Sequence, residues 1–202
     1  MFRHFPPIGA AVAIAALITL TPPAGAAPDP RAFVDQLGTQ GIEMLGPQVP
    51  PAQRVARFRQ LFQADFDVDG IGRFVIGRYW RDFTPAQQQQ FLRLFQAYTV
   101  QAYSKRLGQY GGAQFRVTGM RPLGGEVVVN SEVIRPSGPP VRIDWHLIDV
   151  GGEYKIEDVD VDRVSMIASQ RDEFARIIEN NSGQPAALLA VLRQQLNERP
   201  AT

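Results

Sequence analysis

Hydrophobic residues recur at helical spacing between Phe66 and Leu107, and the pattern predicts two helices joined by a hinge. The first helix is short, and Asp67 or Asp69 can cap it. Its apolar positions are Ile71, Phe74, Val75 and Tyr79, with Trp80 and Phe83 closing it. The second helix begins at a capping box in which Thr84 is the N-cap and Gln87 is its reciprocal partner. This helix is amphipathic. Its apolar face is largely aromatic and carries Phe91, Leu94, Phe95, Tyr98 and Ala102.

Aromatic residues are concentrated in the same part of the chain. The chain has 12 Phe, 5 Tyr and 2 Trp residues, and 13 of these 19 lie between Phe58 and Phe115. Aromatic side chains at helical spacing are usually core residues, so a well-packed interior is one interpretation. The other is that the rings line a cavity that holds an apolar molecule. The pattern alone leaves both open.

Apolar residues at helical spacing also predict helices nearer the two ends of the chain. Residues Pro30 to Leu45 form the first, which Gly38 and Gly41 weaken. A second segment opens at Pro50-Pro51, and its apolar positions are Val55, Phe58, Leu61 and Phe62. Towards the C-terminus we expect a helix from Ser165 to Asn180. After Gly183 we expect a last helix, which carries Leu188, Leu189, Leu192 and Leu196.

Between these helices the period changes from helical to alternating, which predicts a sheet. Four strands are expected: Gln114 to Met120, Glu126 to Ile134, Val141 to Ile148 and Tyr154 to Val161. The connections between them are short and rich in Gly and Pro, so neighbouring strands must be antiparallel. We therefore expect an α+β fold in which several helices pack on one face of a curved four-stranded antiparallel meander.

The third strand alternates most clearly. Its apolar face is predicted to carry Val141, Ile143, Trp145 and Leu147, and its solvated face Arg142, Asp144 and His146. In the fourth strand, the apolar residues change phase between Ile156 and Val159. This change predicts a bulge or a bend near Glu157-Asp158.

The first 26 residues have the pattern of a secretory signal peptide. A basic residue, Arg3, precedes an apolar run from Ile8 to Leu20, and Ala24-Gly25-Ala26 offers small residues for cleavage before Ala27. A retained anchor is the alternative, but the apolar run is shorter than the ~20 residues that span a bilayer. We expect residues 1–26 to be removed and residues 27–202 to form a single secreted domain.

Composition excludes several classes of function. The first 26 residues hold one of the 21 basic residues and none of the 20 acidic ones, so the mature chain has no net charge. It has no run of like charges either, which argues against nucleic-acid binding. The chain contains no Cys, which excludes thiolate metal sites and Cys nucleophiles.

Candidate catalytic residues are few. His146 is the only His of the mature chain, and Asp144 and Asp149 are its nearest acidic neighbours in sequence. A solvated charged pair on the polar face of a strand is ordinary, and one His with scattered carboxylates has no metal-ligand spacing. No nucleophile or phosphate-binding motif is present. We therefore expect no catalytic residue, no metal and no cofactor.

Several motifs carry a resemblance to a known family. They are Gly77-Arg78-Tyr79-Trp80-Arg81 followed by Thr84-Pro85, Lys155-Ile156 followed by Asp158-Val159 and Val164-Ser165, and Arg171 to Ile178. In these motifs the chain resembles the MlaC or toluene-tolerance family of periplasmic lipid carriers over nearly all of the mature sequence. The ending NNSGQPAALLAVLRQQL is similar to the hopanoid-associated branch of that family. Arg163 stands where the family commonly has Gly before Val-Ser, so the turn after the last strand, and its role in partner contact, can differ.

The resemblance implies a non-catalytic periplasmic carrier that takes the acyl chains of a phospholipid or hopanoid-type lipid into a pocket between sheet and helices. It also implies docking to lipid-transport complexes of the inner and outer membranes, and we expect a monomer. The predicted lipid-binding positions follow from inward phase alone: Phe74, Trp80, Phe95, Tyr98, Val129, Ile143, Trp145 and Leu147. Two alternatives stay open: a hydrolase that depends on His146, and a protein-binding module whose aromatic residues are only core.

Overall fold

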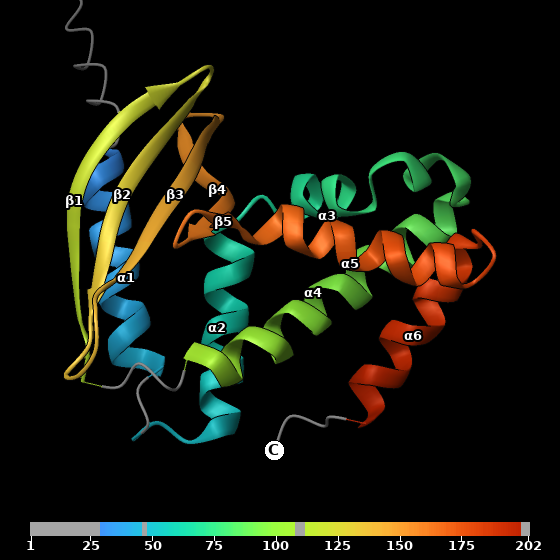
Figure 1. Cartoon of the computed structure of the whole chain (residues 1–202), viewed down its shortest axis with the longest axis horizontal. Helices are drawn as coiled ribbons and strands as arrows, with labels where there is room; N and C mark the ends of the chain where they lie inside the picture. The colour runs from blue at the N-terminus through green and yellow to red at the C-terminus, as the bar shows by residue number, and fades with distance from the viewer. Residues whose placement is uncertain (1–28, 46–47, 108–111, 199–202) are drawn as a thin grey trace, which may run out of the picture.

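The structure is a computed structural model that describes residues 29–45, 48–107 and 112–198. The predicted signal peptide, residues 1–26, lies outside these ranges. An antiparallel sheet packs against helices on one of its faces (Figure 1). The helices are α1 (Pro30–Leu45), α2 (Pro51–Asp65), α3 (Val68–Ile76), the 3₁₀ helix η1 (Gly77–Asp82), α4 (Pro85–Leu107), α5 (Met166–Asn180) and α6 (Pro185–Glu198). The strands are β1 (Gln114–Leu123), β2 (Glu126–Ile134), β3 (Val141–Val150), β4 (Glu153–Val161) and β5 (Val164–Ser165).

The sheet is the predicted antiparallel meander with one strand more than expected. Its order is β1-β2-β3-β4-β5, and β5 pairs with the end of β4 through Val164 and Ser165. Two residues are too few to show alternation, which is why the sequence pattern did not reveal β5. A tight turn makes the pairing possible, because Asp162 and Arg163 both have positive φ, 49° and 69°. This is the backbone that two-residue hairpin turns require, and Gly adopts it more readily than Arg does.

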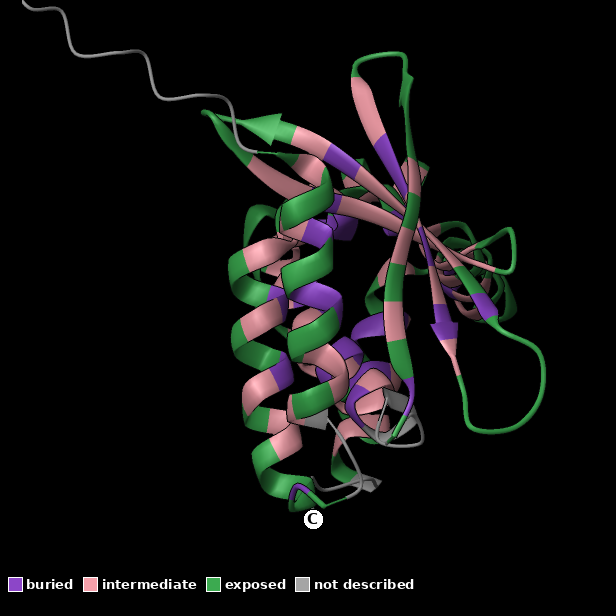
Figure 2. Ribbon diagram, turned by 90° about the vertical axis from the view of Figure 1, so that its left-hand side faces the viewer, coloured by how far each residue is buried: buried purple, intermediate pink, exposed green. Residues whose placement is uncertain are grey.

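Two irregularities interrupt the ladders. In β4, His146 pairs with Asp158 and Leu147 pairs with Ile156, so Glu157 is the extra residue of a bulge, as predicted. A second bulge, which was not predicted, lies in β1 between Val117 and Gly119. Bulges bend and twist the strands that contain them, and the sheet is visibly curved in Figure 1. Buried residues gather on the strands and on the helix faces turned towards them, while the turns between strands are exposed (Figure 2).

The region from Phe66 to Leu107 is two helices and a hinge, as predicted, but the first α-helix is shorter than expected. It ends at Ile76, and the chain continues as η1 through Tyr79 and Trp80. Gly77 has φ 55°, and a Cβ there would lie 3.0 Å from the guanidinium of Arg171. Both caps are confirmed: the Asp67 carboxylate accepts from Gly70 N at 3.1 Å, and the N–H of Thr84 donates to Gln87 Oε1 at 2.9 Å.

The helices away from the sheet enclose an aromatic core, which we call the helical core (Figure 1). Phe91 of α4 is fully buried and stacks on Phe95, with ring centroids 5.7 Å apart. Phe174 of α5 meets both rings edge-on, at 6.0 and 6.2 Å. Leu188 and Leu192 of α6 are also fully buried there. No helix in the described ranges is long and apolar enough to cross a membrane.

Candidate functional site

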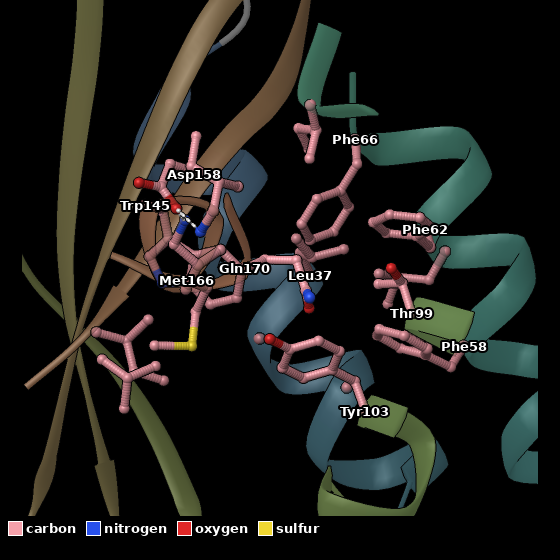
Figure 3. A pocket seen from close by; sticks show the side chains of 18 of the residues that line it. Leu37, Phe58, Phe62, Phe66, Thr99, Tyr103, Trp145, Asp158, Met166 and Gln170 are labelled. Atoms are coloured by element: carbon pink, nitrogen blue, oxygen red, sulfur yellow. Dashed lines mark hydrogen bonds between the residues drawn. The ribbon is translucent and has the colours of Figure 1, made fainter. Parts of the chain in front are cut away.

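A cavity of about 440 Å³ lies between the inner face of the sheet and helices α1 to α5 (Figure 3). Its lining comes from four strands and five helices, so the whole fold contributes to it. Nearly all the lining side chains are apolar. The polar side chains among them are Thr99, Tyr103, Asp158 and Gln170. An apolar, concave site with few polar groups is typical of pockets that hold small apolar molecules.

Helix α1 forms one wall, and its two glycines have different neighbours. A Cβ on Gly38 would lie only 2.3 Å from the ring of Phe115, so α1 packs directly against β1 at this point. A Cβ on Gly41 would have no heavy atom of the described residues within 4 Å. Leu37 and Ile42 line the cavity on the same side of the helix. The wall therefore contacts the sheet at Gly38 and leaves open space beside Gly41.

The sheet forms the opposite wall, and Trp145 is its largest side chain. The indole N–H of Trp145 donates to Ser131 Oγ at 2.9 Å, and the Ser131 hydroxyl donates to the carbonyl of Ile143 at 3.1 Å. The ring of Phe115 stands edge-on to the indole at 6.2 Å. These contacts orient the indole and satisfy its only polar group, so what Trp145 presents to the cavity is apolar.

Helix α2 supplies a series of aromatic rings. Phe58 stacks on Phe62 at 6.1 Å, and Phe62 contacts Phe66 at 5.0 Å. All three line the cavity, and Figure 3 shows them along one side of it. Phe95 and Tyr103 of α4 extend this wall. A spacing of four residues places Phe58 and Phe62 on one face of α2, and this spacing is the signal by which the sequence could have identified them; Phe66 follows the end of the helix in extended backbone.

Asp158 is a carboxylate in an apolar lining, but its oxygens are already occupied. It accepts the Ser165 hydroxyl, the N–H of Val159 at 2.7 Å and the N–H of Ile167 at 3.2 Å. Ser165 in turn caps α5 by accepting from Ala168 N at 3.1 Å. The residues of the motif Asp158-Val159 followed by Val164-Ser165 thus form the hydrogen bonds that stabilise the corner between the sheet and the start of α5. The role of Asp158 is to hold this corner.

Three of the eight positions predicted from inward phase line the cavity: Phe95, Ile143 and Trp145. Val129 and Leu147 lie on the same face of the sheet but are fully buried, in a cluster with Val34 and Leu37 of α1. Alternation places a residue on a face, but it does not say whether a helix covers that part of the face.

The other three predicted positions lie among the helices, outside the lining. Phe74 is 42% exposed, with the guanidinium of Arg171 5.1 Å from its ring centroid. Trp80 meets the edge of Phe91, and Tyr98 packs against Phe174 at 6.1 Å. For Phe74 the expected inward phase is wrong, because α3 buries Ile71, Val75 and Ile76 instead.

The candidate catalytic residues do not form a site. His146 lies on the outer face of the sheet, as predicted, but its side chain is only 15% exposed, whereas a solvated one was expected. Nδ1 lies 3.3 Å from Glu126 and Nε2 lies 3.3 Å from Asp160. Asp144 accepts instead from Asn130 at 2.8 Å, and Asp149 accepts from Gly152 N in a turn. Within the described ranges no group of three His or acidic residues is placed to hold a metal.

The surroundings of His146 shift two pKa values upwards. Burial lowers the pKa of His146, but hydrogen bonds that the imidazolium donates to the Glu126 and Asp160 carboxylates, together with the negative charges of Asp160 and Asp158, outweigh burial and raise it above the ordinary value. Burial, together with a hydrogen bond to Glu126, raises the pKa of Glu157 to about 7. Neither His146 nor Glu157 lines the cavity.

A curved antiparallel sheet and a helical layer that enclose an apolar cavity define an α+β protein with an internal apolar cavity. The comparisons with known proteins place the chain more narrowly. The family model described as MlaC protein matches residues 46–194, and the chain belongs to this family. The resemblance in the sequence motifs is thereby confirmed at the level of the family.

Two known proteins are similar to this chain. The toluene tolerance protein ttg2D of Pseudomonas putida is 27% identical over 155 residues, which are 76% of this chain and 62% of that protein's length. The solved structure of the phospholipid-binding protein from Ralstonia solanacearum, in complex with a phospholipid, is similar in fold, with a TM-score of 0.72. It covers 85% of this chain and 98% of its own at 21% identity, so the two proteins share a fold.

Proposed function

We propose that this protein is a periplasmic lipid carrier that holds acyl chains of a phospholipid in the cavity and passes the lipid between complexes of the inner and outer membranes. The observation that carries the proposal is the apolar cavity of about 440 Å³ between sheet and helices. Membership of the MlaC family supports it, as does a similar fold in a protein solved with a phospholipid.

The size of the cavity matches a hydrocarbon chain. A cavity of ~150 Å³ lined by Leu, Ile and Phe holds benzene, which has six carbons, so by proportion about 440 Å³ accommodates roughly 18 carbons. Burying about 14 methylenes at ~0.8 kcal/mol each contributes roughly 11 kcal/mol before the ordering costs of binding are deducted. Spontaneous release of such a ligand is slow, so delivery needs a partner at each membrane.

The remaining parts of the proposal rest on the sequence. The signal-peptide pattern of residues 1–26 supports export to the periplasm. The ending at residues 180–196 supports a hopanoid-type lipid as a second ligand class. The lining of the cavity supports carriage without catalysis, because its one carboxylate, Asp158, is engaged by Ser165, Val159 and Ile167.

Mass spectrometry of an organic extract of the purified, exported protein tests the proposal. We expect about one lipid per protein, and we expect the melting temperature of lipid-stripped protein to rise when phospholipid is added back. Phospholipid, hopanoid and free fatty acid are separate outcomes of the same extract. If the exported protein carries no lipid and added lipid leaves its melting temperature unchanged, the carrier proposal is wrong. Release of fatty acid from added phospholipid, abolished by His146→Ala, would establish the hydrolase instead.

A further inference from the structure

Helix α1 contains a position where the absence of a side chain leaves the cavity open. Gly41 lines the cavity, and a Cβ built on it would meet no heavy atom within 4 Å among the residues that the structure describes. The cavity-facing stripe of α1 is Leu37, Gly38, Gly41 and Ile42, while Thr39, Gln40 and Glu43 are exposed. Residues at this spacing share one face of a helix, so a side chain at position 41 would extend from the same face as Leu37 and Ile42.

Other glycines within helices are explained by their neighbours. At Gly38 a Cβ would collide with the ring of Phe115, and at Gly72 it would lie 2.5 Å from a methyl carbon of Leu92. Gly41 has no such neighbour among the described residues, and its φ is not in the left-handed region. Gly is an unfavourable residue inside a helix, and no atom in the described part of the chain requires it at this position. What a side chain there would displace is the content of the cavity.

We propose that Gly41 sets the length of acyl chain that the cavity accepts; the inference rests on the carrier function proposed above. The space beside Gly41 is part of a volume that holds roughly 18 carbons. Each carbon added to residue 41 removes space for about one carbon of the ligand. A Leu side chain has four carbons, so Gly41→Leu shortens the preferred acyl chain by about four carbons, and Gly41→Ala by about one.

The loss of affinity for a long chain follows from the same geometry. Each methylene that stays outside the cavity loses its burial free energy, which raises Kd about fourfold. Exclusion of four methylenes weakens binding of the longest chain by roughly 100-fold or more. Short chains, which do not reach the space beside residue 41, keep their wild-type affinity.

The experiment loads lipid-stripped protein with an equimolar mixture of lysophospholipids whose acyl chains run from about 12 to about 18 carbons, and native mass spectrometry reports which are bound. The variants are Gly41→Ala and Gly41→Leu. Gln40→Leu is the matched control, because it adds the same side chain to the neighbouring, exposed position of the same helix. We expect a graded shift to shorter chains in the two Gly41 variants and the wild-type distribution in Gln40→Leu.

Each other outcome overturns the inference. If Gly41→Leu is folded and binds the wild-type distribution, residue 41 does not bound the ligand. If it loses all chain lengths equally, Gly41 lies at an entrance and does not set length. If Gly41→Leu fails to fold while Gln40→Leu folds, position 41 is packed against the protein. If the wild type itself takes up no lysophospholipid or phospholipid, the proposed function has failed, and that result is distinct because it does not depend on the variants.

Discussion

Two regions of this protein are built from the same kind of residue and differ in what surrounds it. In the helical core, Phe91 has aromatic neighbours on several sides, namely Trp80, Phe83, Phe95 and Phe174. At the cavity, Phe58, Phe62 and Phe66 have protein on one side and the cavity on the other, and Phe58 and Phe62 form the border between the helical core and the cavity. Some of the aromatic residues therefore pack against other rings, and others line a cavity.

The comparison shows that hydrophobicity and spacing bury a side chain but do not determine what fills the space next to it. In the helical core, Phe91 is fully buried, and its aromatic neighbours come from η1, the residue after it, α4 and α5. At the cavity, α1 presents Gly41 where a larger residue would close the space. Atoms beside an empty space lack contact partners on that side, so they contribute less to folding and are available to a ligand.

The largest effect is expected from removing a ring in each region. Phe91→Ala should lower the free energy of unfolding by about 3–5 kcal/mol, because Phe91 is fully buried among aromatic rings. Phe66→Ala should cost roughly half as much, because Phe66 is half-buried and borders the cavity. Urea denaturation of the lipid-stripped proteins measures both. Equal losses would mean that the cavity wall is packed as tightly as the helical core.

The next effect concerns adding a ring. Val129→Trp should destabilise the stripped protein by about 1–3 kcal/mol, because Val129 is fully buried against α1. Val161→Trp places the same ring in the cavity, so it should leave stability nearly unchanged and reduce co-purified lipid. Thermal melts and lipid extraction of the pair measure the two results. If Val161→Trp destabilises the lipid-stripped protein as much as Val129→Trp does, protein atoms fill the cavity beside Val161, and the expectation is wrong.

A smaller effect is expected at the corner that joins the sheet to α5 beside the cavity. Arg163 has φ 69°, in the left-handed region, where a residue with a Cβ is strained. Arg163→Gly should therefore raise the free energy of unfolding by about 0.5–1 kcal/mol after the greater freedom of Gly in the unfolded chain is deducted. Arg93→Gly, the same change within α4, should instead lower it by about 1 kcal/mol. Destabilisation by both changes would show that the Arg163 side chain itself contributes to the corner.

The smallest effect separates the two faces of the sheet. The pKa of Glu157 is raised from 4.5 to about 7, so between these values the folded protein binds a proton that the unfolded chain has released. Stability should therefore fall as pH rises through this window. His146, whose pKa is also raised, adds a loss as pH passes its folded value. Because Glu157 is partly exposed, screening limits its part to about 1 kcal/mol or less.

Glu157→Gln removes the carboxyl and should flatten the stability profile in that window. Denaturation at several pH values measures this, and lipid content should not change because Glu157 faces away from the cavity. A pH-dependent lipid content that disappears in Glu157→Gln would contradict the separation of the two faces.

Local rules in the sequence determined most of the elements. The helical periods predicted all the long helices, the Thr84–Gln87 capping box placed the start of α4, and the change of phase after Ile156 placed the bulge of β4. These features depend on residues a few positions apart, so a single stretch of sequence contains all that they need. The two-residue strand β5 was missed because it arises from a turn at Asp162-Arg163 and has no periodicity of its own.

Only the tertiary structure decided which inward residues meet a cavity. Ile143 and Val129 both lie on the inner face of the sheet, yet the packing of α1 covers Val129 and leaves Ile143 exposed to the cavity. Tertiary structure also decided the surroundings of His146. Its partners Glu126 and Asp160 come from β2 and β4 and reach it only through strand register. Alternation and helical spacing determine the direction of a side chain from its own backbone. The distance to the next layer is determined by residues far away in sequence, such as Gly38 against Phe115.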